Sequence, residues 1–172
     1  LFLANLIPYK NHNLIIDAAR ILPKNLNYKI KILGQGNENY TSQLIEKIRL
    51  CNLIDKFEFY GSVKNPEKFL SQSQIGILCS DEEGLSNSII EYMNYKLPVI
   101  ATSVGGNSEL VITNSNGFLI KKGDVRDLAL KLELLIRNSN LRFKFGENGF
   151  NILKKKFSTK NILHYQKVYS KL

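Results

Sequence analysis

The stretch SDEEGLSNSIIEYMNYKLPVIATSVGG, residues 80–106, decides how the rest of the chain is arranged. An apolar run at 75–79 precedes it and predicts a buried strand that ends in three acidic residues. Gly84 then precedes a run of helical spacing that carries Glu91, and a second apolar run, 98–102, ends near two glycines. Strand, loop, helix and strand in this order form the repeating unit of a parallel sheet.

Short apolar runs alternate with amphipathic runs along the whole chain. Strands are predicted at 1–7, 28–33, 57–60, 75–79, 98–102 and 117–120, and helices at 14–22, 42–51, 66–70, around Glu91, at 108–111, from Asp124 to Ile136, and in two pieces over about 141–172 that break at Phe157-Ser158. This alternation predicts an α/β fold with a doubly wound parallel sheet, Rossmann-like, whose faces are both covered by helices. Residues 1–172 are expected to form a single domain.

Composition narrows the function classes. The chain has 172 residues, of which 44% are hydrophobic, and this is enough for one sizeable core. The net charge of +9 favours an anionic partner, but no basic stripe is interleaved with aromatic residues. A nucleotide or a membrane surface therefore ranks above nucleic acid, and no nucleic-acid partner is expected.

Targeting signals are also absent from the sequence. No run approaches the roughly 20 apolar residues of a membrane span, and the chain does not open with a signal peptide, so a cytoplasmic location is expected. The chain begins inside an apolar run at Leu1 and its single methionine is Met93, which indicates a part of a longer protein. Cys51 and Cys79 form neither a disulfide framework nor a metal-ligand set, and buried reduced thiols are expected.

Glycines follow several of the predicted strands. They are Gly34 and Gly36 after the second strand, Gly61 after the third, Gly84 after the fourth, and Gly105 and Gly106 after the fifth. Each of them alone is an ordinary turn glycine. Because the carboxyl ends of parallel strands meet at one edge, where such sheets bind ligands, the set as a whole predicts a binding site there.

The loop at residues 84–87 indicates which kind of ligand this site binds. It leads into a helix, and its backbone N–H groups together with the helix dipole favour a phosphate or diphosphate. Glu83 and Glu91 flank this helix start with seven residues between them. At ~1.5 Å rise per residue they lie too far apart for one acid/base pair, so we expect them to hold two ends of an extended ligand, with sugar hydroxyls donating to each carboxylate. The alternative for Glu91 is a surface acid paired with a lysine.

Several blocks resemble a known family when they are taken together. The run EGLSNSIIEYM at 83–93, then LPVIAT at 97–102 and VGGNSE at 104–109, resembles the E-x7-E block of retaining GT-B glycosyltransferases of the group 1 or family 4 type. Residues 6–12, 32–36, 59–63 and 116–124 resemble other blocks of that family in the same order. The resemblance covers nearly the whole chain.

The resemblance implies the carboxy-terminal, donor-binding half of a GT-B enzyme, with the N-terminal acceptor domain absent from this chain. The implied catalytic residues are Lys10, on the diphosphate, and Glu83, facing the donor sugar. The implied donor-binding residues are Asn5, Gly34, Gly36, Val63 at the base, Gly84, Leu85, Ser86 and Asn87 at phosphate or sugar, and Glu91 at the ribose. The implied donor is a nucleoside-diphosphate sugar, the implied acceptor is a glycan or a lipid-linked molecule, and no metal or other cofactor is expected.

Two departures from the family pattern stand in this sequence. Many members carry a Gly-Arg pair where Ala4-Asn5 stands here, so one diphosphate cation is missing. The family's Glu-Ala-Met reads Glu91-Tyr92-Met93. His12 stands at a helix start, where capping or packing is favoured over catalysis, and His164 is expected on the surface.

Three functions stay open at this point. The first is transfer of a hexose from a nucleotide sugar with retention of configuration, inactive in the isolated domain. The second is a GT-B nucleotide-sugar epimerase or phosphorylase half-domain. The third is a non-enzymatic anion-binding α/β module. Peripheral contact with the inner face of the membrane is compatible with the basic composition.

Overall fold

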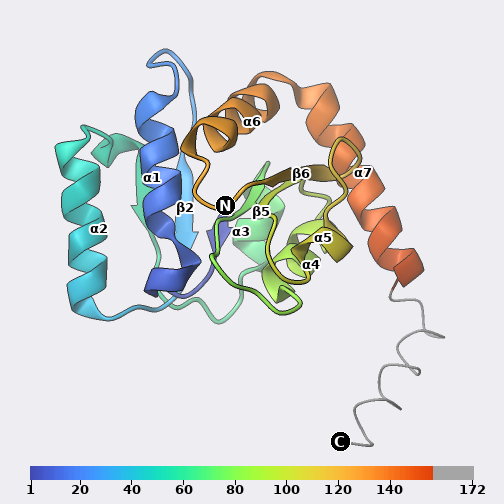
Figure 1. The fold of residues 1–172 in the computed structure, drawn as a ribbon, viewed down its shortest axis with the longest axis horizontal. Helices are drawn as coiled ribbons and strands as arrows, with labels where there is room; N and C mark the ends of the chain where they lie inside the picture. Colours follow the sequence, from blue (N-terminus) through green and yellow to red (C-terminus); the bar gives the residue numbers. More distant parts are fainter. Residues whose placement is uncertain (157–172) are drawn as a thin grey trace, which may run out of the picture.

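The computed structural model of the chain describes residues 1–156 and contains one sheet of six parallel strands (Figure 1). The strands are β1 (Phe2–Leu3), β2 (Ile30–Leu33), β3 (Phe57–Phe59), β4 (Gly76–Leu78), β5 (Val99–Thr102) and β6 (Gly117–Ile120). Their order is β3-β2-β1-β4-β5-β6, and every neighbouring pair is parallel. The strand order reverses between β1 and β4, and this switch point is where such sheets bind ligands.

Helices connect the strands in the order that the sequence predicts. They are α1 (His12–Ile21), α2 (Glu38–Leu50), α3 (Glu67–Gln72), α4 (Asn87–Asn94), α5 (Asn107–Leu110), α6 (Val125–Arg137) and α7 (Ser139–Lys156), with two short 3-10 turns, η1 (Pro8–Lys10) and η2 (Ile54–Lys56). The doubly wound α/β prediction is therefore confirmed. The predicted break at Phe157-Ser158, the terminal helix beyond it and His164 lie outside the described residues.

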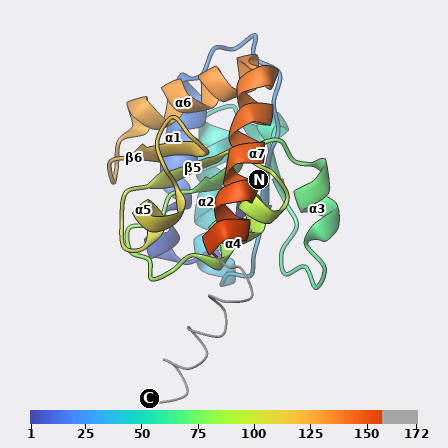
Figure 2. The ribbon, with the colours of Figure 1, turned by 90° about the vertical axis from the view of Figure 1, so that its right-hand side faces the viewer.

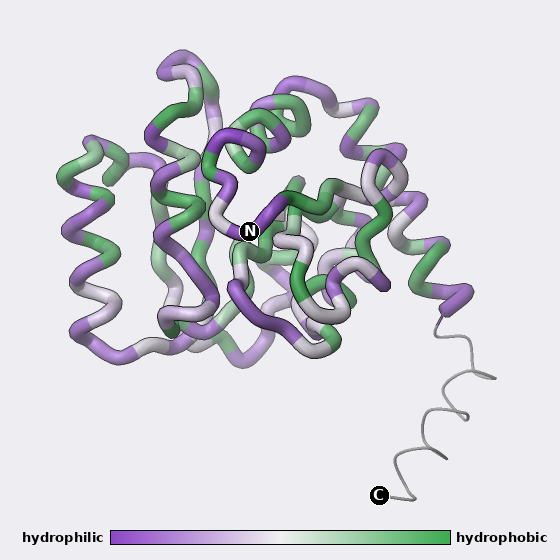
Figure 3. The backbone as a smooth tube through the Cα atoms, in the orientation of Figure 1, coloured by the Kyte–Doolittle hydropathy of each residue, from purple (hydrophilic) through white to green (hydrophobic). Residues whose placement is uncertain are grey.

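Alternate strand residues face two separate cores. In β2, Ile30 and Ile32 pack with the buried faces of α1, α2 and α6, whereas Leu33 belongs to the core beneath α3, α4 and α5. In β4, Ile77 packs in the core with α1, α2 and α6, and Leu78 packs in the core beneath α3, α4 and α5. Figure 2 shows α7 running along the side of the molecule that holds α4. In Figure 3 the hydrophobic residues follow the central strands, while α2 alternates between hydrophobic and hydrophilic turns.

Helix caps explain where several helices begin. Asn11 caps α1 by accepting a hydrogen bond from Leu14 N at 3.2 Å, and Asp124 caps α6 by accepting from Asp127 N at 2.9 Å. Helix α2 starts earlier than the predicted 42–51, because Asn37 caps it by accepting from Tyr40 N at 2.7 Å. An asparagine followed by an acidic residue is a helix-start signal that the prediction overlooked.

The first predicted strand, 1–7, is longer than the strand that forms. Regular pairing stops at Leu3, and the chain then runs beside the end of β2 through single backbone bonds, such as Leu6 N to Gln35 O at 2.8 Å. Its next residues form η1, because Pro8 favours the first turn of a helix. This early departure frees residues 4–10 to reach the edge of the sheet as a loop.

Three further expectations concern buried side chains and the membrane. Cys79 is buried as expected, but Cys51 is only half-buried because it caps the end of α2. His12 is fully buried and packs on Phe2 with ring centroids 4.4 Å apart, which confirms packing. Burial lowers the pKa of His12 to about 4, so its imidazole is neutral at pH 7.

Within residues 1–156, no helix combines the length and apolar character needed to cross a bilayer.

Candidate functional site

A cleft of about 420 Å³ opens at the carboxyl ends of β1 and β2, beside the switch point of the sheet. Four of the residues expected to bind a donor line it, namely Asn5, Lys10, Gly34 and Val63. Gly36 lies on the far side of the same turn, in a neighbouring hollow that Gly34 also lines. Sequence positions 5 to 63 thus converge on one cavity, as parallel topology requires.

Lys10 and Glu83 meet at the edge of this cleft. The Nζ atom of Lys10 donates to Oε1 of Glu83 at 2.5 Å, and the two side chains are only 17% and 9% exposed. Ser80 Oγ donates to the same oxygen at 2.6 Å. The structure therefore brings both predicted catalytic residues into direct contact. An ammonium has three donors, so the bond to Glu83 leaves Lys10 two further N–H groups for a diphosphate.

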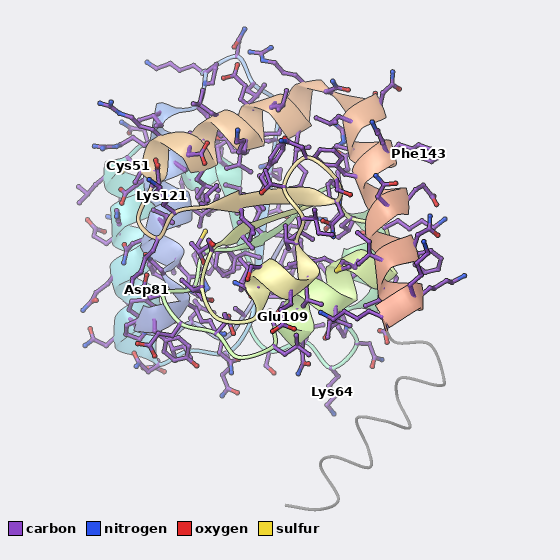
Figure 4. The ribbon with its side chains drawn as sticks, turned by 45° about the vertical axis from the view of Figure 1, so that its right-hand side comes forward. Cys51, Lys64, Asp81, Glu109, Lys121 and Phe143 are labelled. Carbon is purple, nitrogen blue, oxygen red and sulfur yellow. The ribbon has the colours of Figure 1, made fainter. Side chains whose placement is uncertain are left out.

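The three consecutive acids after β4 do not converge on one point. Asp81 accepts from Asn11 Nδ2 at 3.1 Å and lies 3.7 Å from Lys122 Nζ. Figure 4 shows Asp81 on the side of the molecule where α1 and the turn bearing Lys121 lie. Asp81 thereby links the start of α1 to the loop before α6. Within residues 1–156, no group of three or more His, Cys, Asp or Glu side chains could hold a metal ion.

The glycine-containing turn after β2, residues 34–36, packs tightly against the loop at residues 4–10. A Cβ added at Gly34 would come within 2.0 Å of the Ala4 carbonyl oxygen, and one at Gly36 would come within 2.5 Å of Leu6 Cβ. Asn5 accepts from Gln35 N through its side chain at 3.3 Å. Packing of the chain itself therefore requires both glycines, whether or not a donor binds beside them.

The start of α4 faces the same edge. Ser86 is buried and caps the helix by accepting from Ile89 N, while Gly84, Leu85 and Asn87 are exposed. A Cβ added at Gly84 would meet no atom within 4 Å, so this glycine leaves open space beside the loop. The exposed loop and the amino-terminus of an eight-residue helix together present N–H groups that suit a phosphate.

Glu91 lies on α4, three residues after Ser88, which lines the cleft. Residues three apart share one helix face, so Glu91 lies on the cleft side of α4. Its Oε2 atom is buried and has no hydrogen-bond partner among residues 1–156. Burial raises the pKa of Glu91, and the negative charge of Glu67 adds to this increase. Among residues 1–156 this Oε2 atom bonds to no lysine, so the alternative of a surface acid paired with a lysine does not describe Glu91.

Three residues of the site escaped the sequence prediction. Ser80 holds Glu83, and Ser88 Oγ donates to the Leu3 carbonyl at 2.6 Å. Tyr92 accepts from Leu3 N at 2.7 Å and donates to the Ile77 carbonyl at 3.2 Å, so its hydroxyl joins β1 to β4. A serine three residues before a loop glutamate is a weak signal, and nothing in the sequence indicates the bonds to Leu3.

Comparison with known families decides the classification. The family described as "Glycosyl transferases group 1" matches residues 1–152. The chain belongs to the glycosyl transferases group 1 family. This group 1 domain has the fold of the carboxy-terminal domains of GT-B glycosyltransferases, which confirms the family and the fold that the resemblance implied.

Curated relatives are glycosyltransferases of greater length. A protein of Methanocaldococcus jannaschii described as an uncharacterized glycosyltransferase is 33% identical over 174 residues, which cover 100% of this chain and 48% of that protein. The poly(ribitol-phosphate) alpha-N-acetylglucosaminyltransferase of Staphylococcus aureus is 30% identical and covers 94% of this chain and 33% of its own length. The chain thus spans a third to a half of these relatives.

Solved structures agree with this placement. A crystal structure of S. aureus TarM, a G117R mutant in complex with fondaparinux, alpha-GlcNAc-glycerol and UDP, superposes with a TM-score of 0.86 at 29% identity over 95% of this chain and 34% of TarM. The C-terminal domain of the group 1 protein LpcC from Francisella tularensis superposes with a TM-score of 0.83 at 23% identity, over 92% of this chain and 85% of that domain. The second likeness concerns the fold alone.

Proposed function

We propose that the chain is the donor-binding domain of a retaining glycosyltransferase that moves a hexose from a nucleoside-diphosphate sugar to a glycan or lipid-linked acceptor. The observation that carries the proposal is the buried Oε2 of Glu91 on the cleft side of α4, which has no hydrogen-bond partner within the described residues 1–156. A buried carboxylate oxygen is costly unless it accepts a hydrogen bond, and ribose hydroxyls are donors that a nucleotide in the cleft supplies. UDP in the TarM complex supports a nucleoside diphosphate as the ligand.

The roles of the other residues follow from charge and position. Lys10 turns its remaining N–H groups to the diphosphate, and the N–H groups at the start of α4 meet the second phosphate or the sugar. Glu83 accepts from a hydroxyl of the donor sugar, and Val63 packs on the base. Asn5 supplies no charge, so Lys10 carries the cationic contact on this side of the cleft.

Transfer requires one bond to break and one to form. The bond between the anomeric carbon and the diphosphate oxygen breaks, and its electron pair leaves with the nucleoside diphosphate. The acceptor hydroxyl oxygen bonds to the same face of that carbon, and its proton passes to the departing phosphate. Lys10 and the amino-terminus of α4 stabilise the charge that develops on the leaving group, which lowers the barrier without a metal. The acceptor binds to the domain that is missing here.

Binding of nucleotides to the 172-residue chain tests the proposal. Calorimetry with UDP, GDP and ADP should show binding of at least one, and Glu91→Gln should weaken that binding about tenfold, since it replaces a charged hydrogen bond worth ~1.5 kcal/mol. The same substitution should have little effect on the corresponding 2′-deoxynucleotide. A matched control is Glu147→Gln, because Glu147 pairs with Lys96 on the exposed surface of α7.

The wild-type result decides between the functional classes. If none of the three nucleotides binds to the wild-type chain, the donor site is wrong. Salt-sensitive polyanion binding that survives both Glu91→Gln and Lys10→Met would then favour a non-enzymatic anion-binding module. Product analysis on the longer protein separates transfer from epimerisation, since only transfer releases nucleoside diphosphate together with a glycosylated acceptor.

A further inference from the structure

Three fully buried polar side chains lie behind the loop that carries Glu83. Ser80 follows β4, Thr102 ends β5, and Asn107 begins α5. Buried polar groups are expected to be hydrogen-bonded, and these three bond in sequence. Asn107 Nδ2 donates to the Thr102 carbonyl at 3.0 Å, and Thr102 Oγ1 donates to the Ser80 carbonyl at 2.5 Å. The chain of bonds ends where Ser80 Oγ donates to Glu83 at 2.6 Å.

The turn after β5 holds the backbone around these hydrogen bonds in place. Gly105 has φ +49°, and a Cβ there would come within 1.7 Å of the Glu83 carbonyl oxygen. Gly106 N donates to the Gly84 carbonyl at 3.1 Å. The loop from Ser80 to Gly84 is therefore packed onto the turn after β5, and the position of Ser80 relative to Glu83 is determined by two neighbouring strands.

Both bonds to the Glu83 carboxylate end on one oxygen. Oε1 accepts from Ser80 and from Lys10, which leaves Oε2 as the oxygen that can meet a ligand. Lys10 is also the cation that a diphosphate attracts, so its bond to Glu83 weakens when a donor binds. Ser80 has no such competing partner, because its hydroxyl is 0% exposed and cannot reach the ligand. Of the two groups that donate to Oε1, the serine is therefore the one whose bond the diphosphate does not weaken.

We propose that Ser80, held in turn by Thr102, is a positioning residue that orients the Glu83 carboxylate toward the donor sugar. This inference rests on the proposed function of the cleft. It assigns recognition of the sugar, as distinct from the nucleoside diphosphate, to a residue that does not touch the donor. A carboxylate acts as an oriented acceptor only when its own rotamer is fixed by such supporting bonds.

Two measurements on the 172-residue chain test it. The first compares the affinities for UDP-glucose, UDP-N-acetylglucosamine and UDP. Ser80→Ala should lower the affinity for the better-bound sugar nucleotide about tenfold and change the UDP affinity less than about twofold, as expected for loss of one oriented charged contact. Thr102→Val should act in the same direction but less strongly. Ser73→Ala is the matched control, because Ser73 Oγ makes a bond of the same length, 2.6 Å, to the Phe69 carbonyl.

A double variant separates positioning from general damage to the fold. If Ser80 acts through Glu83, then Ser80→Ala should cause no further loss in a chain that already carries Glu83→Gln. Additive losses, or equal losses for UDP and the sugar nucleotide, would overturn the proposal.

The second measurement does not depend on the donor. NMR side-chain couplings of Glu83 should indicate a single rotamer in the wild-type chain and in Ser73→Ala, and averaging between rotamers in Ser80→Ala. Unchanged couplings in Ser80→Ala would contradict a positioning role even if no nucleotide binds. Absence of nucleotide binding with the expected couplings would overturn the proposed function while leaving the positioning of Glu83 intact.

Discussion

At the scale of single residues, the raised pKa of Glu91 opposes stability, whereas the binding role proposed for this residue requires the carboxylate. Its pKa is raised, mainly by burial and further by Glu67, so the folded chain favours the protonated carboxyl more than the unfolded chain does. The stability that follows is fully present below the pKa of the unfolded state and is lost as pH rises through the folded pKa. Above its folded pKa, the ionised carboxylate of Glu91 therefore lowers the stability of the fold.

This conflict predicts how Glu91→Gln affects folding. The variant should melt about 2 °C above wild type at pH 7.5, and the difference should shrink as pH falls toward 4, since the neutral amide lacks the buried charge. Thermal unfolding monitored by circular dichroism between pH 4 and 8 measures both the difference in melting temperature and its dependence on pH. Glu147→Gln should show no such gain. A wild-type-like melting temperature for Glu91→Gln throughout this range would contradict the assignment of a destabilising buried charge.

Helix α4 shows how one departure from the family pattern is accommodated at the scale of elements. Tyr92 is fully buried against Gly76, where a Cβ would come within 2.3 Å of the tyrosine ring. Its hydroxyl lies between β1 and β4, bonding to Leu3 N and to the Ile77 carbonyl. Tyr92 on α4 and Gly76 in β4 therefore form one structural unit, since the tyrosine ring occupies the space that a side chain at position 76 would need. The two strands meet at the switch point through this side chain.

The unit predicts a strong coupling between positions 76 and 92. Gly76→Ala alone should destabilise the chain by about 2 kcal/mol, because the added methyl group overlaps the ring of Tyr92. In a Tyr92→Ala background the same substitution should cost close to nothing. Urea unfolding of the two single variants and the double variant gives the coupling energy, expected at about 2 kcal/mol. Additive costs would show that ring and glycine do not constrain each other.

The elements themselves were largely predictable, and their ends were not. Hydrophobic periodicity predicts all six strands and their parallel arrangement, because short apolar runs that alternate with amphipathic helices are typical of a parallel sheet covered by helices. The order of the strands within the sheet was not predicted. The short β1 and the early start of α2 depend on contacts that periodicity does not report. Residues 4–6 leave the strand to pair with the turn after β2, and Asn37 extends α2 by capping it.

At the scale of the whole molecule, one continuous sheet connects the cleft to both cores. Strands β1 and β2 end at the cleft, and the same strands separate the two helical layers. A ligand that holds the first loop, the turn after β2 and α4 together therefore stabilises the entire domain. Local unfolding of one half would expose the interior of the other.

A thermal-shift experiment tests this connection. A nucleoside diphosphate at a hundred times its Kd should stabilise the chain by ~2.7 kcal/mol and raise Tm by about 5 to 10 °C, in a single transition. Differential scanning calorimetry measures both features. The free nucleoside at the same concentration should shift Tm much less, because it lacks the phosphates that we propose Lys10 and the start of α4 bind. Two separate transitions, with only one shifted by the nucleotide, would contradict a single cooperative domain.

The sequence by itself determined the fold class, the family and which residues reach one edge of the sheet, because periodicity and the order of motifs are properties of the chain alone. Only the tertiary structure decided how those residues meet. It paired Lys10 with Glu83, placed Ser80 behind them and left Glu91 Oε2 without a partner among residues 1–156. Contacts between residues 70 or more positions apart depend on side-chain rotamers and on the packing of β4 and β5, which no local pattern records.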